Sequence, residues 1–263
     1  MIRNNNIDRR AVRNGKLGGN VSCKRGYIYE DFKYNVITAK YLGGAATGTA
    51  GDRNIMQTRM NTFEYRVQGT QTILAPVLTT VGLDISLDQT DNDGVEYTHG
   101  ILSRCEVAFT IGTSAAFSFR VKFKIADVSG TDDCCVGFRK AEAYQTAVDD
   151  YDEAAFLNVI LGDIKIETIL NAAATTTTDT TDNWADAATH TLKVSITAGG
   201  VVTYLIDGVA PTTTAAFTFD SAEVVIPFFL FIQATTTPGI VELIEWEVGT
   251  ADEDNEITAS LTA

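Results

Sequence analysis

The chain has 263 residues, of which 45% are hydrophobic and 21% charged, and its formal net charge is −14. This balance is typical of a globular protein, and a chain of this length can bury a sizeable core. No apolar run approaches the ~18 residues that a transmembrane helix requires, and the N-terminal sequence MIRNNNIDRR lacks the apolar core of a signal peptide. We therefore expect no membrane partner.

Charge is distributed unevenly along the chain. Up to Arg66 there are twelve basic and five acidic side chains, a net +7, which leaves −21 for the remainder. This asymmetry predicts a basic N-terminal arm that meets an acidic partner, either nucleic acid or the acidic face of a neighbouring protein. The partner-binding residues that we expect in the arm are cations and the first aromatic side chains: Arg3, Arg9, Arg10, Arg13, Lys16, Lys24, Arg25, Tyr27, Tyr29 and Phe32.

The first 26 residues are polar, basic and rich in Asn and Gly, so they cannot build a core of their own. They are either an extended arm that becomes ordered on a partner or a solvated, disordered tail. Their spaced apolar residues, together with the charge contrast, favour the arm. Few aromatic residues are interleaved with the cations before Tyr27, so sequence-specific recognition of nucleic acid is not expected.

Strand-like patterns begin at residue 62. Phe63, Tyr65 and Val67 alternate with polar residues, and residues 83–88 repeat this period of two. Residues 116–125 give the clearest half-buried strand, because five apolar side chains share one face and polar side chains occupy the other. These apolar residues are Phe117, Phe119, Val121, Phe123 and Ile125.

The next segments alternate between loops and strands. Residues 142–156 are predicted to form either a short helix or an acidic loop. Residues 155–161 and 163–170 are strand-like, and residues 172–188 have the low-complexity Thr, Ala and Asp composition of a loop. Residues 189–249 then contain four strand-like runs, of which the first two are joined by a Gly-Gly hairpin and the second ends in an Asp-Gly turn.

Closely spaced strands with little helical periodicity indicate an all-β, antiparallel β-sandwich. We expect three parts: an extended basic arm and docking segment at residues 1–61, the sandwich at residues 62–249, and an acidic C-terminal tail at residues 250–263. Within the first part, residues 27–41 are aromatic-rich and partly alternating, and they form either a strand or an extended docking segment.

The four cysteines, Cys23, Cys105, Cys134 and Cys135, fit no zinc or redox spacing. The adjacent pair would point to opposite faces of a strand, so the two thiols cannot easily share a metal ion. We expect buried free thiols, in keeping with assembly in a reducing compartment.

Two features resemble sites of chemistry. Residues 89–94, QTDNDG, resemble part of a calcium loop, but Gln89 and Gly100 stand where that loop needs acids, so an acidic turn is the better interpretation. Glu245 and Glu247 share a strand face and could form a glycosidase pair, whereas Glu242 is expected on the opposite face. Without a Trp-rich cleft around them, these carboxylates are interpreted as a solvated outer face.

The two histidines, His99 and His190, have no neighbouring partners that suggest a catalytic triad, and His190 is interpreted as a surface or hairpin residue. No Gly-rich loop precedes a helix, so nothing favours phosphate binding. We therefore predict no catalytic residues, no metal site and no cofactor.

The runs THTLKVSITAGGVVTYLIDGVAP, FTFDSAEVVIPFFLFIQ and VELIEWEVG resemble the concanavalin-A-like jelly roll of laminin-G and lectin domains. The earlier pieces FSFRVKFKIADVSGTDDCCVGFRKAEAY and LDQTDNDGVEYTHG are similar to the matching half of this module in tailed-bacteriophage virion proteins. Such modules occur in head decoration (cement) proteins and head fibres. The resemblance covers roughly residues 62–249, and the calcium and sugar residues of lectins have no clear counterparts here.

The resemblance implies a non-enzymatic structural protein of the virion, assembled in the host cytoplasm and located on the capsid surface. Its partners would be the major capsid protein, which the N-terminal arm would bind, and copies of itself in a homo-oligomer. The alternative is a lectin-like module that binds glycans of the host surface, and a glycoside hydrolase is a further alternative.

Overall fold

The computed structural model describes a β-sandwich with two short 3₁₀ turns. It covers residues 28–32, 38–40, 47–48, 53–58, 61–69, 71–72, 76–85, 90–99, 107–234 and 240–250. Within these ranges no helix is long and apolar enough to cross a membrane. The all-β, antiparallel sandwich predicted from the sequence is confirmed.

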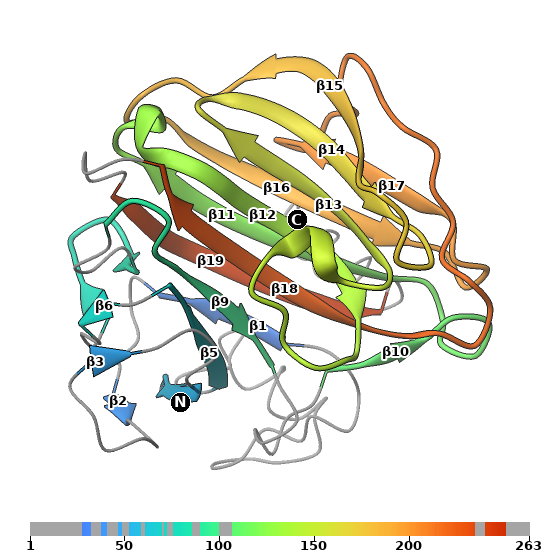
Figure 1. Ribbon diagram of the computed structural model, residues 1–263, viewed down its shortest axis with the longest axis horizontal. Coiled ribbons are helices and arrows are strands. Elements are labelled where there is room, and N and C mark those ends of the chain that lie inside the picture. The colour runs from blue at the N-terminus through green and yellow to red at the C-terminus, as the bar shows by residue number, and fades with distance from the viewer. Residues whose placement is uncertain are drawn as a thin grey trace, which may run out of the picture.

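The smaller layer is a seven-stranded sheet in which every pairing is antiparallel. Its main path runs β17 (Val202–Ile206), β16 (Thr189–Ile196), β11 (Phe117–Ile125), β19 (Val241–Thr250), β8 (Leu83–Asp84) and β7 (Val77–Leu78), and β1 (Ile28–Asp31) also pairs with β19. Strand β11 lies between β16 and β19, as Figure 1 shows. The strand predicted most clearly from alternation is therefore central to this sheet.

The larger layer is a ten-stranded antiparallel sheet. Its main path runs β15 (Thr176–Asn183), β14 (Asp163–Ile169), β13 (Ala154–Ile160), β12 (Thr131–Lys140), β18 (Val224–Gln233), β9 (Gly94–Thr98), β5 (Thr62–Gln68), β4 (Arg53–Gln57) and β2 (Thr38–Lys40), and β10 (Phe109–Thr110) also pairs with β18. A separate small ribbon joins β3 (Thr47–Gly48) to β6 (Gln71–Thr72).

The main core lies between the two sheets and follows from the period-two pattern of the strands. Phe119 and Val121 of β11 and Tyr65 of β5 point into it, and all three are buried. Within this core the rings of Phe63 and Trp246 pack in a T-shaped pair, with centroids 5.3 Å apart. Aromatic pairs in this geometry stabilise a core beyond their area of burial.

The hairpins are made by residues that tolerate positive φ. The predicted Gly-Gly hairpin joins β16 to β17, and Gly200 has φ +89°. Asp207 and Gly208, with φ 51° and 81°, form the two-residue turn that pairs Ile206 with Val209. Positive φ at both central residues is the type I′ geometry, which suits the twist of antiparallel strands.

A second, smaller core lies on the outer face of the large sheet. Residues 141–153, which we call the strap, cross this face between β12 and β13, and Figure 1 shows them in front of β18. The strap is a loop with one 3₁₀ turn, η3 (Val148–Asp150), so the loop rather than the helix is correct. Val148 and Tyr151 of the strap pack on Phe228 and Leu230 of β18. Apolar burial therefore holds the strap against the sheet.

Two segments differ from expectation. Residues 176–183, expected to be loop, form β15 at the edge of the large sheet, because the Thr-rich run has high β propensity and pairs with β14. Strands β1, β2 and β4 precede residue 62 yet pair with the two sandwich sheets. The sheets therefore extend past the expected boundary at residue 62, and of the two alternatives for residues 27–41 the strand is correct at β1 and β2.

Candidate functional site

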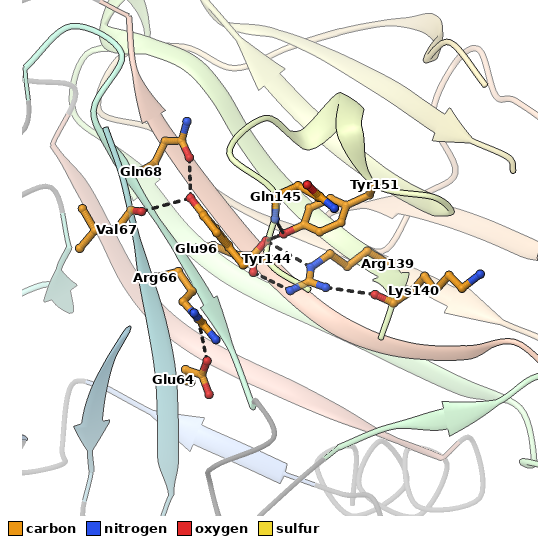
Figure 2. Close-up of polar contacts among 10 residues, drawn as sticks. All are labelled: Glu64, Arg66, Val67, Gln68, Glu96, Arg139, Lys140, Tyr144, Gln145 and Tyr151. Atoms are coloured by element: carbon orange, nitrogen blue, oxygen red, sulfur yellow. Dashed lines mark hydrogen bonds and ion pairs between the residues drawn. The ribbon is translucent and has the colours of Figure 1, made fainter. Parts of the chain in front are cut away.

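A network of polar side chains lies beside the strap on the outer face of the large sheet (Figure 2). On β9, Val95 and Tyr97 point into the main core, so Glu96 between them points outward beneath the strap. On β5 the same alternation directs Glu64 and Arg66 outward. The site is thus assembled from the neighbouring strands β9 and β5, together with β12 and the strap.

A buried ion pair forms the floor of this site. Arg139 donates from Nη2 to Glu96 Oε1 at 2.7 Å and from Nε to Oε2 at 3.2 Å. Tyr151 donates its hydroxyl to Glu96 Oε2 at 2.7 Å, and the Arg139 guanidinium lies 4.3 Å from the centroid of the Tyr151 ring. The side chains of Arg139 and Glu96 are only 5% and 1% exposed. The floor is therefore a compact, desolvated network with charge-assisted bonds.

The electrostatics of the floor keep its charge state fixed. Burial opposes the charge of Arg139, but the Glu96 carboxylate outweighs it and raises the pKa of Arg139 above its usual value. Burial, together with the charge of Glu96, also raises the pKa of Tyr151 well above its usual range. Around neutral pH Arg139 is therefore charged and the Tyr151 phenol is neutral.

The rim of the site is polar and partly exposed. The half-buried Tyr144 of the strap donates its hydroxyl to the Val67 carbonyl at 3.1 Å and to Gln68 Oε1 at 2.5 Å, as Figure 2 shows. Arg66 donates from Nε to Glu64 Oε1 at 2.8 Å and lies 5.9 Å from the centroid of the Tyr144 ring. Its side chain is 26% exposed. An aromatic ring, a guanidinium and an amide thus meet at one edge of the strap.

A second polar cluster lies further along the same sheet face. The buried Asn158 donates from Nδ2 to Asp133 Oδ1 at 2.6 Å and to Glu167 Oε2 at 2.8 Å, and its carbonyl accepts from the Cys134 amide at 2.9 Å. Burial raises the pKa of Asp133 to about 6. Thr177 donates to the other oxygen of Glu167 at 3.0 Å. Because these bonds join members of the cluster to one another, we interpret the cluster as a structural network.

Glu242, Glu245 and Glu247 lie on the outer face of the opposite, smaller sheet. The register of β11 and β19 shifts between Lys122 and Phe123, which pair with Glu245 and Leu243. This β-bulge leaves one extra residue on β19 and reverses the alternation. The prediction that Glu242 points to the opposite face is therefore wrong, and all three carboxylates pair with cations of β11: Arg120, Lys122 and Lys124.

The histidines and the described cysteines are structural in character. His99 is buried against Phe63 and Trp246, and burial lowers its pKa to about 3. His190, interpreted as a surface residue, bonds Asp207 at 2.6 Å with its Nδ1. Cys134 and Cys135 are free and buried, as predicted, whereas Cys23 and Cys105 lie outside the described residues.

The predicted arm residues are mostly outside the described part of the chain. This holds for all seven cations and for Tyr27. Tyr29 is half-buried on β1, opposite Glu247 of β19. Phe32 is fully buried with its ring 5.6 Å from that of Phe63, so it belongs to the main core and cannot contact a partner from there. Its apolar ring gains more from the core than from solvent.

The residues of the strap network were missed by sequence reasoning. Glu96 and Arg139 are 43 positions apart, and Tyr144 bonds to residues 76 and 77 positions away. The local sequence shows only that Glu96 and Arg139 are charged residues next to apolar residues of their strands. The described residues also contain no group of three His, Cys, Asp or Glu side chains that could hold a metal ion. In the QTDNDG turn, Asp93 instead accepts a bond from Thr90 Oγ1 at 2.6 Å.

No family model and no curated protein matches the sequence. Among solved structures, the potassium-bound carbohydrate recognition domain of Emp46p is similar, with a TM-score of 0.50 and 8% identity over 70% of this chain and 88% of that one. The carbohydrate recognition domain of Emp47p has a TM-score of 0.47 and 12% identity, over 79% and 96% of the two chains. The carbohydrate-binding module CBM66 of Bacillus subtilis has 0.41 and 14%, over 64% and 87%.

At such low identity the likeness to Emp46p shows the fold alone, a lectin-like jelly roll. Nothing in the comparisons links the chain to phage capsid proteins. The resemblance stated from the sequence is therefore supported in its fold but not in its assignment to the virion.

Proposed function

We propose that the chain is a non-catalytic carbohydrate-binding protein, and that its ligand is held at the rim formed by Tyr144, Arg66 and Gln68. The observation that carries the proposal is this combination of an aromatic ring and planar polar groups on the outer face of a lectin-type sheet. The name of the similar Emp46p domain, a carbohydrate recognition domain, adds support.

The chemistry of the rim suits a sugar. A pyranose ring has apolar C–H faces, which pack on an aromatic ring, and hydroxyl groups, which both donate and accept. Arg66 supplies only donors, Glu64 only acceptors and Gln68 both. A few such groups around an aromatic surface fix the orientation of a small ligand. The Tyr144 hydroxyl is already bonded to β5, so the ring is held in place before a ligand arrives.

A glycan array with the purified full-length protein tests the proposal. We expect binding to a limited set of glycans, weakened at least about tenfold by Tyr144→Ala or Arg66→Ala, a change of about 1.4 kcal/mol in binding free energy. Arg120→Ala, on the opposite sheet, is the matched control and should bind like the wild type. Absence of binding to every glycan at high protein concentration, or full affinity in Tyr144→Ala, would contradict the proposal.

The non-catalytic part of the proposal rests on the ion pairs of Glu245 and Glu247, the two carboxylates that could form a glycosidase pair. Glu245 and Glu247 both bond the Arg120 guanidinium, at 3.0 and 2.7 Å from Nη2. Both carboxylates are thus engaged by the same guanidinium, whereas a glycosidase needs one carboxyl group placed to protonate the leaving group and the other placed to attack or to activate water. Glycan hydrolysis that disappears in Glu245→Gln or Glu247→Gln would contradict this part.

A structural role on a phage virion is a second candidate, favoured by the contrast between +7 up to Arg66 and −21 beyond it. In that role the N-terminal segment would bind the major capsid protein, and the protein would lie on the capsid surface as a homo-oligomer. Deleting residues 1–26 should then abolish binding to capsids while the sandwich stays folded. Full occupancy of capsids by the truncated protein would contradict this role.

A further inference from the structure

The base of the strap contains a carboxylate without hydrogen-bond partners. Glu153 is 1% exposed, and neither of its two oxygens has a donor in hydrogen-bonding geometry. Its backbone carbonyl accepts from the Lys140 amide at 2.8 Å, which closes the base of the strap where β12 ends and β13 begins. A buried carboxylate in this position is costly when ionised, because no donor replaces the lost water.

The groups around Glu153 are mainly acidic. Asp220 and Glu223, in the loop before β18, both disfavour its ionisation. Among the described residues, the cation that acts on Glu153 is Lys140. It is bonded to Asp152 of the strap and to Glu223 Oε1 at 3.0 Å, so its charge is shared between those carboxylates. Ionised Glu153 would therefore add a further negative charge to the base of the strap.

From this geometry we propose that Glu153 is a proton-dependent latch of the strap, which holds it closed when protonated and loosens it when ionised. The proposal rests on the proposed function in one respect: because the strap carries Tyr144, the latch would regulate carbohydrate binding at the rim. The strap itself responds to pH whether or not the rim binds sugar.

The charges around Glu153 place the pH at which the strap loosens near neutrality. Burial, followed by Asp220 and Glu223, raises the pKa of Glu153 to about 7 from 4.5. The backbone amide of Asp220, which lies close but outside hydrogen-bonding geometry, and Lys140 offset only part of this rise. In an opened strap the group regains its ordinary pKa. The closed strap therefore binds the proton more tightly, so closure is most favourable below pH 4.5 and weakens as the pH rises towards 7.

Hydrogen exchange of the full-length protein without ligand tests the latch. After correction for intrinsic exchange rates, we expect protection of the amides of residues 141–153 to fall at least about tenfold between pH 5 and pH 7.5, since each unit of pKa difference corresponds to a factor of ten. In Glu153→Gln, which mimics the protonated acid at every pH, protection should not change. Asp150→Asn removes an exposed acid from the same strap and should behave like the wild type.

Three results would overturn the latch: constant protection in the wild type, a retained pH response in Glu153→Gln, or recovery at pH 7.5 on adding CaCl2 or KCl, which would assign Glu153 to a cation. If Glu153→Gln does not fold, Glu223→Gln serves instead and should move the transition to lower pH. The hydrogen-exchange experiment contains no glycan, so its outcome is independent of the glycan array. The latch can be confirmed when carbohydrate binding fails, and carbohydrate binding can be confirmed when the latch fails.

Discussion

Arg139 and Glu96 form a two-point ion pair across β18, the strand that separates their own strands β12 and β9. The pair lies beneath the strap, where Tyr151 completes the bonding of the carboxylate. Arg120 and Glu247 form a similar pair on the opposite sheet, but there the arginine side chain is 28% exposed. The two pairs have the same chemistry and differ in burial.

Removing one member of the Arg139–Glu96 pair should therefore cost more than removing one member of the less deeply buried Arg120–Glu247 pair. We expect Arg139→Met to lower the free energy of unfolding by about 3–5 kcal/mol, because Glu96 is left buried and unpaired. Arg120→Met should cost less, about 1–2 kcal/mol, because the side chains of Glu245 and Glu247 keep partial access to water. Urea unfolding of both variants measures the difference, and equal losses would show that burial does not govern the strength of these pairs.

Two glycines offer a matched test of backbone packing between strands. A Cβ at Gly137 would lie 2.3 Å from the Ala155 carbonyl oxygen and 2.4 Å from the Phe156 Cβ, whereas a Cβ at Gly199 meets nothing within 4 Å. We expect Gly137→Ala to destabilise the protein by at least about 2 kcal/mol, in the range of overpacked cores. Gly199→Ala should stay within about 0.5 kcal/mol of the wild type. Thermal unfolding followed by circular dichroism would reveal whether the strands separate to relieve the first contact.

His99 should make the protein less stable in acid. Its pKa falls from 6.5 to about 3 on burial, so between these values the unfolded chain binds a proton that the folded chain does not, and stability rises with pH. At pH 5 the loss relative to pH 8 should be about 2 kcal/mol. His99→Phe removes this contribution, so the difference in unfolding free energy between variant and wild type should grow as the pH falls from 6.5. A constant difference across that range would contradict the assignment.

The bulge in β19 predicts which of two adjacent residues supports the core. Leu243 is fully buried in the core between the sheets, whereas Glu242 faces outward and bonds Lys124 at 3.3 Å. Leu243→Ala should cost about 2–5 kcal/mol, the usual range for such a truncation. Glu242→Ala should cost less, about 1.5 kcal/mol, because it removes the ion pair with Lys124 and the hydrogen bond from Thr79 but opens no cavity between the sheets. The reverse order in denaturant unfolding would mean that β19 keeps a regular alternation.

The sandwich could be predicted because its strands alternate strongly. Phe117 to Ile125 place five apolar side chains on one face, and the structure buries all five. The Gly-Gly hairpin was equally predictable, because the residues that permit its turn lie next to each other in the chain. The edge strand β15 was missed because its Thr-rich run has little apolar alternation, and only its pairing with β14 distinguishes it from a loop.

The candidate site was much less predictable. Nothing local in residues 141–153 indicates that Tyr144 reaches β5 or that Tyr151 meets Glu96, since these contacts join segments 55 to 77 positions apart. The bulge that turns Glu242 outward depends on the register between β11 and β19. Phe32 was expected in a partner-binding arm because the aromatic-rich composition of the segment around it is typical of a docking segment. In the structure, β1 instead brings Phe32 into the core.

The sequence by itself determined the class of fold, since period-two alternation and turn residues act over a few positions. It also determined the division of charge between the two parts of the chain. Only the tertiary structure decided which charges are buried, which carboxylates share a face and where the strap lies. Those properties depend on contacts between distant strands, and burial in such contacts sets the pKa of Glu153 and His99.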